Sequence, residues 1–301
     1  MKKRTITGIV MLAILAPLFL IPNLFIGLQI VVGLGVLIAI FEILNIYNKD
    51  YTIQSKLLIY FLSLLSYLVM IWHFDDIDQM ILLELFNYKL VLVIIMAGFL
   101  LLLVTVLDRN FDFNDFGKVF GMIFYVVMGL GSLVVLRIVG VQFIVYLFLT
   151  TMFTDVFAYL IGIKYGKHKM APMISPKKSW EGAIAGTLIA TILVGTFSLF
   201  YGKIFSSGFL NVNNYRTILD GFEILSKINL TGKGILLYLL TFMISIIGQL
   251  GDLVASKIKR VYNVKDFGNI FPGHGGVLDR FDSAMFAGMF LIIVLTFLTI
   301  L

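Results

Sequence analysis

Polar residues that could do chemistry gather in one long segment, residues 248–283, of an otherwise apolar chain. Gln249, Asp252, Ser256 and Lys259 recur at a spacing that puts them on one face of a helix continuing from about residue 236. A carboxylate and an amide on such a helix are costly in lipid, so this face should meet protein or water. The alternative is an ordinary solvated loop between two membrane spans.

Carboxylates also cluster where the next helix begins. Asp279 and Asp282 are three residues apart, which puts both on one helix face, and Asp252 lies across the intervening loop. Three carboxylates so placed form an oxygen-rich pocket suited to a hard cation such as Mg²⁺. Bases that hold phosphate beside acids that hold Mg²⁺ indicate a nucleotide or phosphoryl site rather than a surface ion-pair network. The bases here are Lys257, Lys259, Arg260, Lys265 and Arg280.

A glycine-rich run, Pro272-Gly273-His274-Gly275-Gly276, precedes the last two carboxylates. Glycine permits positive φ and close backbone approach, so successive N–H groups could cradle anionic oxygens. A plain turn has the same requirement, and the run taken alone favours the turn.

The segment from Ser256 to Asp282, SKIKRVYNVKDFGNIFPGHGGVLDRFD, resembles the signature of the phosphatidate cytidylyltransferase family, also called CDP-diacylglycerol synthases. Its Ser, Lys-Arg, Lys-Asp, His-Gly-Gly and Asp-Arg-x-Asp elements stand in the family's order and at its spacing. Residues 154–182 are similar to a second motif block of that family, Asp-x-x-Ala-Tyr…Gly-Lys…Ile-Ser-Pro-Lys-Lys-Ser-x-Glu-Gly. The resemblance therefore covers residues 151–301, while residues 1–140 match only as hydrophobic spans.

The second block contains further candidates. Asp155 lies well inside a predicted span, where an acid is a functional candidate and a helix-packing role is the alternative. Ser179 stands where a helix N-cap is expected. Lys177 and Lys178 are typical of a positive anchor beside a membrane, and the resemblance shifts their interpretation toward phosphate binding.

Composition predicts an all-α, polytopic integral membrane protein. Of the 301 residues, 60% are hydrophobic and 13% are charged, whereas soluble chains carry roughly 25% charged residues. The absence of cysteine excludes disulfides, thiolate catalysis and cysteine-ligated zinc. Nucleic-acid binding would require a basic face on a soluble module, and the sequence shows none. About nine spans are predicted, at 5–22, 25–46, 56–73, 89–107, 118–138, 141–163, 181–201, 234–255 and 282–300.

Lysine and arginine predict the orientation. Residues 1–140 form an N-terminal region of about five spans, and residues 141–301 form a C-terminal catalytic region. The basic loops 164–180 and 256–281 are predicted to be cytoplasmic, together with the N-terminus and loops 47–55 and 108–117. The connection 74–88, which is rich in acids, is predicted to lie outside. We therefore expect a multi-pass protein of a bacterial inner (plasma) membrane whose site faces the cytoplasm.

The resemblance implies a Mg²⁺-dependent enzyme of phospholipid biosynthesis that converts CTP and phosphatidate to CDP-diacylglycerol and pyrophosphate. It leaves open whether a second cation such as K⁺ binds and whether the protein forms a homodimer. A CTP-dependent transferase for an ether-type lipid phosphate and a non-enzymatic ion-coupled transporter are the alternatives. The residues assigned to catalysis are Asp252, Asp279, Lys259, Arg260, His274 and Arg280; to substrate binding, Ser175, Lys177, Lys178, Ser256, Lys265, Asp266, Gly275 and Gly276; and to metal, Asp252, Asp279, Asp282 and Asp155.

Overall fold

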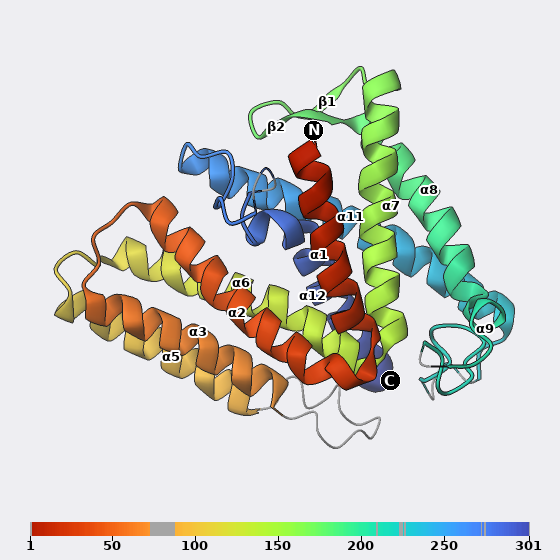
Figure 1. Cartoon of the computed structure of the whole chain (residues 1–301), viewed down its shortest axis with the longest axis horizontal. Coiled ribbons are helices and arrows are strands. Elements are labelled where there is room, and N and C mark those ends of the chain that lie inside the picture. The colour runs from red at the N-terminus through yellow and green to blue at the C-terminus, as the bar shows by residue number, and fades with distance from the viewer. Residues whose placement is uncertain are drawn as a thin grey trace.

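The computed structural model describes residues 2–72, 88–208, 210–222, 225, 227–271, 273 and 275–300. His274 and most of the predicted outer connection 74–88 lie outside these residues. The long helices are α1 (Lys2–Leu20), α2 (Phe25–Tyr47), α3 (Ile53–Ile71), α5 (Tyr88–Leu107), α6 (Phe113–Val139), α7 (Val141–Tyr165), α8 (Trp180–Leu199), α11 (Leu230–Val261) and α12 (Leu278–Ile300) (Figure 1). Two short helices, η1 (Pro22–Leu24) and α9 (Tyr201–Ile204), follow α1 and α8.

Apolar composition and length explain why these helices form a membrane protein. Within the described residues, eight helices are long and apolar enough to cross a membrane, and Gly8–Leu20 of α1 is a shorter apolar segment. The prediction of an all-α, polytopic membrane protein is confirmed. Helix α6 begins earlier than the predicted span 118–138 because Asp112 and Asp115 form a capping box, each side chain accepting the other residue's backbone N–H.

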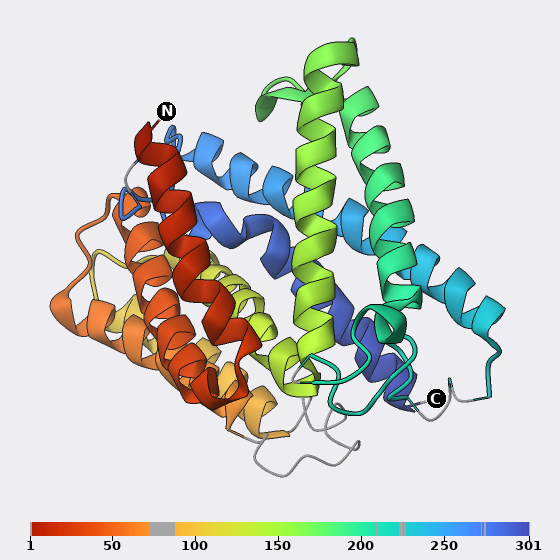
Figure 2. The ribbon, with the colours of Figure 1, turned by 45° about the vertical axis from the view of Figure 1, so that its right-hand side comes forward.

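The helices form two groups that meet at α12. Helices α2, α3, α5 and α6 pack together on one side, and α7, α8 and α11 pack together on the other. Helix α12 packs against both α6 and α11, and α1 contacts α2 and α7 (Figures 1 and 2). Arg137 of α6 donates a hydrogen bond from Nε to the carbonyl of Phe19, which ties the end of α1 to the first group. Helix α1 is thereby held across the junction.

Helices α7 and α8 approach each other through small residues. A Cβ added to Gly182 would lie 2.5 Å from the carbonyl oxygen of Ala158, and one added to Gly186 would lie 2.6 Å from that of Thr154. This is the small-xxx-small packing that lets membrane helices bring their backbones into contact. It fixes the position of α7, which carries Asp155, relative to the segment preceding α8.

That segment is a β-hairpin, which the sequence patterns did not predict. Strands β1 (Lys169–Ala171) and β2 (Ser175–Ser179) pair in antiparallel fashion within the predicted loop 164–180. The strands are short and lack the alternation of apolar and polar residues by which half-buried strands are recognised. Ser179 Oγ accepts the backbone N–H of Gly182 at 3.3 Å, so the predicted N-cap of α8 is confirmed.

The four loops predicted to share one side of the membrane are joined by direct contacts. Lys49 Nζ lies 3.0 Å from a carboxylate oxygen of Asp112, which links loops 47–55 and 108–117. The ring centroids of Tyr47 and Tyr262 are 5.0 Å apart, which links loop 47–55 to loop 256–281. Arg260 Nε donates to a carbonyl in the hairpin turn at 3.2 Å, which brings loop 164–180 to the end of α11. These loops and the hairpin therefore form one continuous surface.

Asp108 organises one of these loops from a buried position. Its carboxylate accepts hydrogen bonds from Thr52 N, Ser55 Oγ and Asn110 N at 2.9, 2.7 and 3.0 Å. Burial opposes ionisation, but the hydrogen bonds outweigh it and hold the pKa of Asp108 at about 2. The carboxylate therefore stays charged at neutral pH and anchors the start of α3.

Candidate active site

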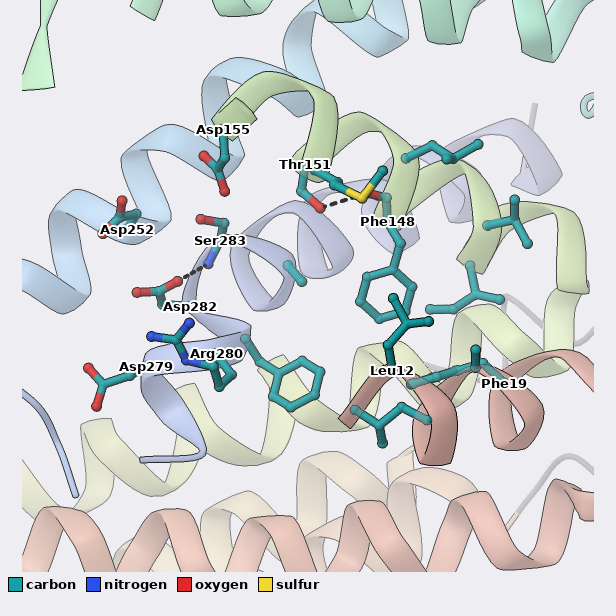
Figure 3. A pocket seen from close by; sticks show the side chains of 18 of the residues that line it. Leu12, Phe19, Phe148, Thr151, Asp155, Asp252, Asp279, Arg280, Asp282 and Ser283 are labelled. Atoms are coloured by element: carbon teal, nitrogen blue, oxygen red, sulfur yellow. Dashed lines mark hydrogen bonds between the residues drawn. The ribbon is translucent and has the colours of Figure 1, made fainter. Parts of the chain in front are cut away.

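A cavity of about 690 Å³ lies between α1, α7, α11 and α12 (Figure 3). Helices α1 and α7 supply its apolar wall, and α11 and α12 supply its polar end. The cavity is therefore amphipathic: a ligand with a hydrocarbon part and a charged part would match it. The apolar lining includes Leu12, Leu15, Phe19, Phe148 and Met152, and the polar lining includes Asp155, Asp252, Lys259, Asp266, Asp279, Arg280 and Asp282.

Asp279 is fully engaged by protein donors. Its side chain is 2% exposed, and its Oδ1 lies 2.7 Å from Lys259 Nζ in a buried ion pair. Its Oδ2 accepts the backbone N–H of Phe267 at 2.7 Å and that of Gly276 at 2.9 Å. Gly275 packs on the same carboxylate with φ +84, a backbone conformation that glycine adopts without strain. Gly275 and Gly276 thus lie against Asp279, and the Gly276 N–H is already donated within the protein.

Asp252 is paired with the hairpin. Lys178 Nζ lies 2.5 Å from Asp252 Oδ2, and Ser256 Oγ donates to Asp252 Oδ1 at 3.2 Å. Lys177 is exposed, whereas Lys178 is half-buried. The two lysines, adjacent in the sequence, therefore have different surroundings.

Asp282 and Asp155 have carboxylate oxygens that accept no hydrogen bond from the described part of the chain. Asp282 Oδ1 accepts the N–H of Ser283 at 2.8 Å, and its other oxygen has no donor within the described part of the chain. Asp155 is exposed, and it has no side-chain hydrogen bond among the described residues. Figure 3 shows Asp155, Asp252 and Asp282 at the polar end of the cavity, each contributed by a different helix.

This donor set fits Mg²⁺ held partly by a substrate. Among the described residues, no three acidic or histidine side chains lie close enough to form a complete metal site. Mg²⁺ at nucleotide sites is usually held by one or two carboxylates, with substrate phosphates and waters as the other ligands. Asp282 and Asp155, beside Asp252, meet that requirement, because they have carboxylate oxygens to which no described residue donates.

The basic residues differ in whether their side chains already bind a protein partner. Arg280 lines the cavity and has no carboxylate within ion-pairing distance among the described residues, so its guanidinium is available to a ligand. Arg260 is exposed and donates to the carbonyls of Ile174 and Val264, which joins the hairpin to the end of α11. Lys265 is exposed on the α11–α12 connection. Ser175, half-buried, begins β2.

The polar residues along one face of α11, here called the polar stripe, have two functions. Gln249 Nε2 donates to Thr187 Oγ1 at 2.7 Å, and Ser245 Oγ lies 2.7 Å from Thr154 Oγ1. These hydroxyl and amide groups hold α11 against α7 and α8. Further along the same face, Asp252 and Lys259 reach the cavity. The predicted continuation of this helix to Lys259 is confirmed, since α11 ends at Val261.

One residue of the site region was missed from the sequence. Glu42 of α2 is buried and accepts the N–H of Val277 at 2.9 Å and that of Leu278 at 3.4 Å. An acid inside an apolar span is a functional candidate by default. Glu42 carries that signal, but it lies outside residues 151–301, which hold the family's motifs.

Comparison with known proteins shows which family this chain belongs to. The model of the cytidylyltransferase family matches residues 2–298. The chain belongs to that family. Proteins named phosphatidate cytidylyltransferase from Staphylococcus haemolyticus (strain JCSC1435), Staphylococcus aureus (strain COL) and Staphylococcus epidermidis (strain ATCC 12228 / FDA PCI 1200) are 37%, 36% and 35% identical to it over 287 residues. Each alignment covers 95% of this chain and 95% of the relative.

Membership of the cytidylyltransferase family makes this protein a nucleotidyltransferase embedded in a membrane. The ion-coupled transporter, an alternative left open by the sequence, is thereby set aside. The family match also extends through the N-terminal helices, which had shown no recognisable motif.

Proposed function

We propose that this cytidylyltransferase joins CTP and phosphatidate to give CDP-diacylglycerol and pyrophosphate. The observation that carries the proposal is the amphipathic cavity, whose apolar wall and charged end match a lipid with a phosphate headgroup. Acyl chains would lie along α1 and α7, and the phosphate would reach the polar end. The names of the staphylococcal relatives support the same substrates.

In this reaction a phosphate oxygen of phosphatidate bonds to the α-phosphorus of CTP. The bond from that phosphorus to the oxygen bridging to the β-phosphate breaks, and pyrophosphate leaves. Both substrates are polyanions, so the site must position them and neutralise their charge. We assign two cations to the phosphates. Arg280 lines the cavity and has no carboxylate partner among the described residues, and Lys178 is paired with the cavity residue Asp252.

We assign Mg²⁺ to Asp252 and Asp282, with Asp155 as a further ligand or cavity wall. When bound, the metal neutralises phosphate charge and orients the leaving pyrophosphate. Asp279 was assigned to the metal from the sequence. Because both of its oxygens already accept hydrogen bonds from protein donors, we now assign it to ordering the connection between α11 and α12.

A direct assay tests this function. Purified protein in detergent is given radiolabelled CTP and phosphatidate, with and without Mg²⁺, and the lipid product is separated. We expect labelled CDP-diacylglycerol only when both substrates and Mg²⁺ are present. Labelling of a different lipid phosphate in preference to phosphatidate would contradict the assigned substrate.

The orientation provides a second prediction. Lys169 in the hairpin and Asn263 after α11 belong to the two most basic loops, which we propose to face the cytoplasm. Because the chain has no cysteine of its own, Lys169→Cys and Asn263→Cys each give a single labelling site. We expect a membrane-impermeant thiol reagent to label both in inside-out vesicles and neither in intact cells. Labelling of either from outside the cell would overturn this orientation.

The two lysines of β2 should differ in their effect on activity. Lys178→Gln removes the cation paired with Asp252, whereas Lys177→Gln changes an exposed side chain. We expect the first change to lower kcat/KM by about 10- to 100-fold and the second to lower it much less. Steady-state rates with varied CTP and varied phosphatidate measure both. Equal losses would mean that the two lysines act together, as a phosphate clamp or as an orientation anchor.

A further inference from the structure

Glu42 joins the N-terminal helices to the polar end of the cavity. It lies on α2, more than 200 residues before its partners, and its carboxylate accepts the backbone N–H groups of Val277 and Leu278. These are among the N–H groups at the start of α12 that have no partner within the helix. A carboxylate at this position also interacts favourably with the helix dipole. Glu42 therefore supplies from a distant helix the cap that the local sequence does not provide.

Two glycines of the α11–α12 connection press against the same carboxylate. A Cβ added to Gly268 would lie 2.5 Å from Glu42 Oε1, and one added to Gly276 would clash with the same oxygen. The connection is therefore closed around Glu42 from two directions. Neither glycine has positive φ, so contact with Glu42, and not backbone conformation, explains why a side chain is excluded there.

Two carboxylates share the N–H groups that lead into α12. Gly276 N donates to Asp279, while Val277 N and Leu278 N donate to Glu42. These three consecutive N–H groups set where α12 begins and how it is rotated. The first turns of α12 carry Arg280 and Asp282, which line the cavity. A shift at Glu42 would therefore displace both of these groups.

We propose that Glu42 is a positioning residue that fixes the start of α12 and so aims Arg280 and Asp282 into the cavity. It does not line the cavity itself, and it acts through the backbone of residues 276–278. The expected loss of kcat when Glu42 is changed rests on the function proposed above. The expected loosening of the backbone around residues 276–278 does not rest on that function, and it is measured separately.

Glu42→Gln tests the proposal with little change of shape. The amide has one oxygen, and its NH₂ group cannot accept a hydrogen bond, so one of the two contacts to α12 is lost. We expect kcat per folded molecule to fall by about 10- to 100-fold, with a smaller change in KM for CTP. We also expect faster hydrogen exchange in the peptide covering residues 267–280, measured without substrates.

Asp108→Asn is the matched control. Asp108 is also a buried carboxylate of the N-terminal region that accepts two backbone N–H groups, and these come from the start of α3 and from its own loop. The control should lower stability while leaving kcat per folded molecule and exchange at residues 267–280 unchanged. If Glu42→Gln and Asp108→Asn affect both quantities equally, Glu42 only stabilises the fold and the proposal is wrong.

Gly268→Ala approaches the same contact from the other side. The added methyl group displaces the Glu42 carboxylate while leaving Glu42 in the chain, so it tests the contact even if Glu42→Gln does not fold. We expect the same loss of kcat and the same faster exchange. The double variant should lose little more than the larger single loss, because both changes act through one contact. Additive losses would overturn the proposal. A wild-type protein without cytidylyltransferase activity would contradict the proposed function, and the exchange data would still decide the role of Glu42.

Discussion

Asp282→Asn is expected to lower kcat by about 10²–10³-fold with little change in the folded fraction. One oxygen of Asp282 has no protein donor among the described residues and lies at the polar end of the cavity. Asparagine keeps the size of the side chain, and its oxygen can still accept the N–H of Ser283. The change therefore removes charge where we propose that Mg²⁺ meets the CTP phosphates, and the loss should fall mainly on the transition state.

The measurement is kcat as a function of Mg²⁺ concentration on purified, folded protein. We expect a higher Mg²⁺ requirement for Asp282→Asn than for the unaltered protein. Asp50→Asn provides a control, because Asp50 is an exposed acid in loop 47–55. Turnover and Mg²⁺ dependence close to those of the control would remove Asp282 from the metal site.

Lys259→Met is expected to lower the free energy of unfolding by about 3–5 kcal/mol. The Lys259 side chain is 11% exposed, and its Nζ lies 2.7 Å from the buried carboxylate of Asp279. Methionine fills a similar volume but leaves a buried negative charge whose remaining donors, among the described residues, are two backbone N–H groups. Removing one partner of a buried pair costs much more than the intact pair contributes, because the remaining charge stays out of water.

Denaturation followed in detergent tests this expectation, with Lys257→Met as the control on the same helix. Lys257 is exposed, so its replacement should change the free energy of unfolding by less than about 0.5 kcal/mol. Equal effects of the two changes would show that the Lys259–Asp279 pair is not an important source of stability. The second change, Asp279→Asn on the Lys259→Met background, should recover part of the loss because it removes the unpaired charge.

The local periodicity of the sequence was sufficient to predict the long helices and the helical part of the site segment. The stripe on α11 follows from the helical repeat of that segment alone, and α11 does continue to Lys259 and beyond. The cap at Ser179 depends on residues only three positions away. The hairpin before it was missed, because its two short strands are stabilised by pairing with each other and by the contact with Arg260.

The membrane architecture, the family signature and the set of charged residues in the site region can all be read from the sequence. How those charges are used depends on the packing of the helices. Asp279 accepts hydrogen bonds from Lys259 and from the backbone, and Asp252 is paired with Lys178. One oxygen of Asp282 has no donor within the described part of the chain. The apolar wall of the cavity comes from α1 and α7, and the cap of α12 comes from Glu42 on α2. Helical periodicity reports neighbours within a turn or two, whereas each of these contacts joins segments that meet only when the helices pack.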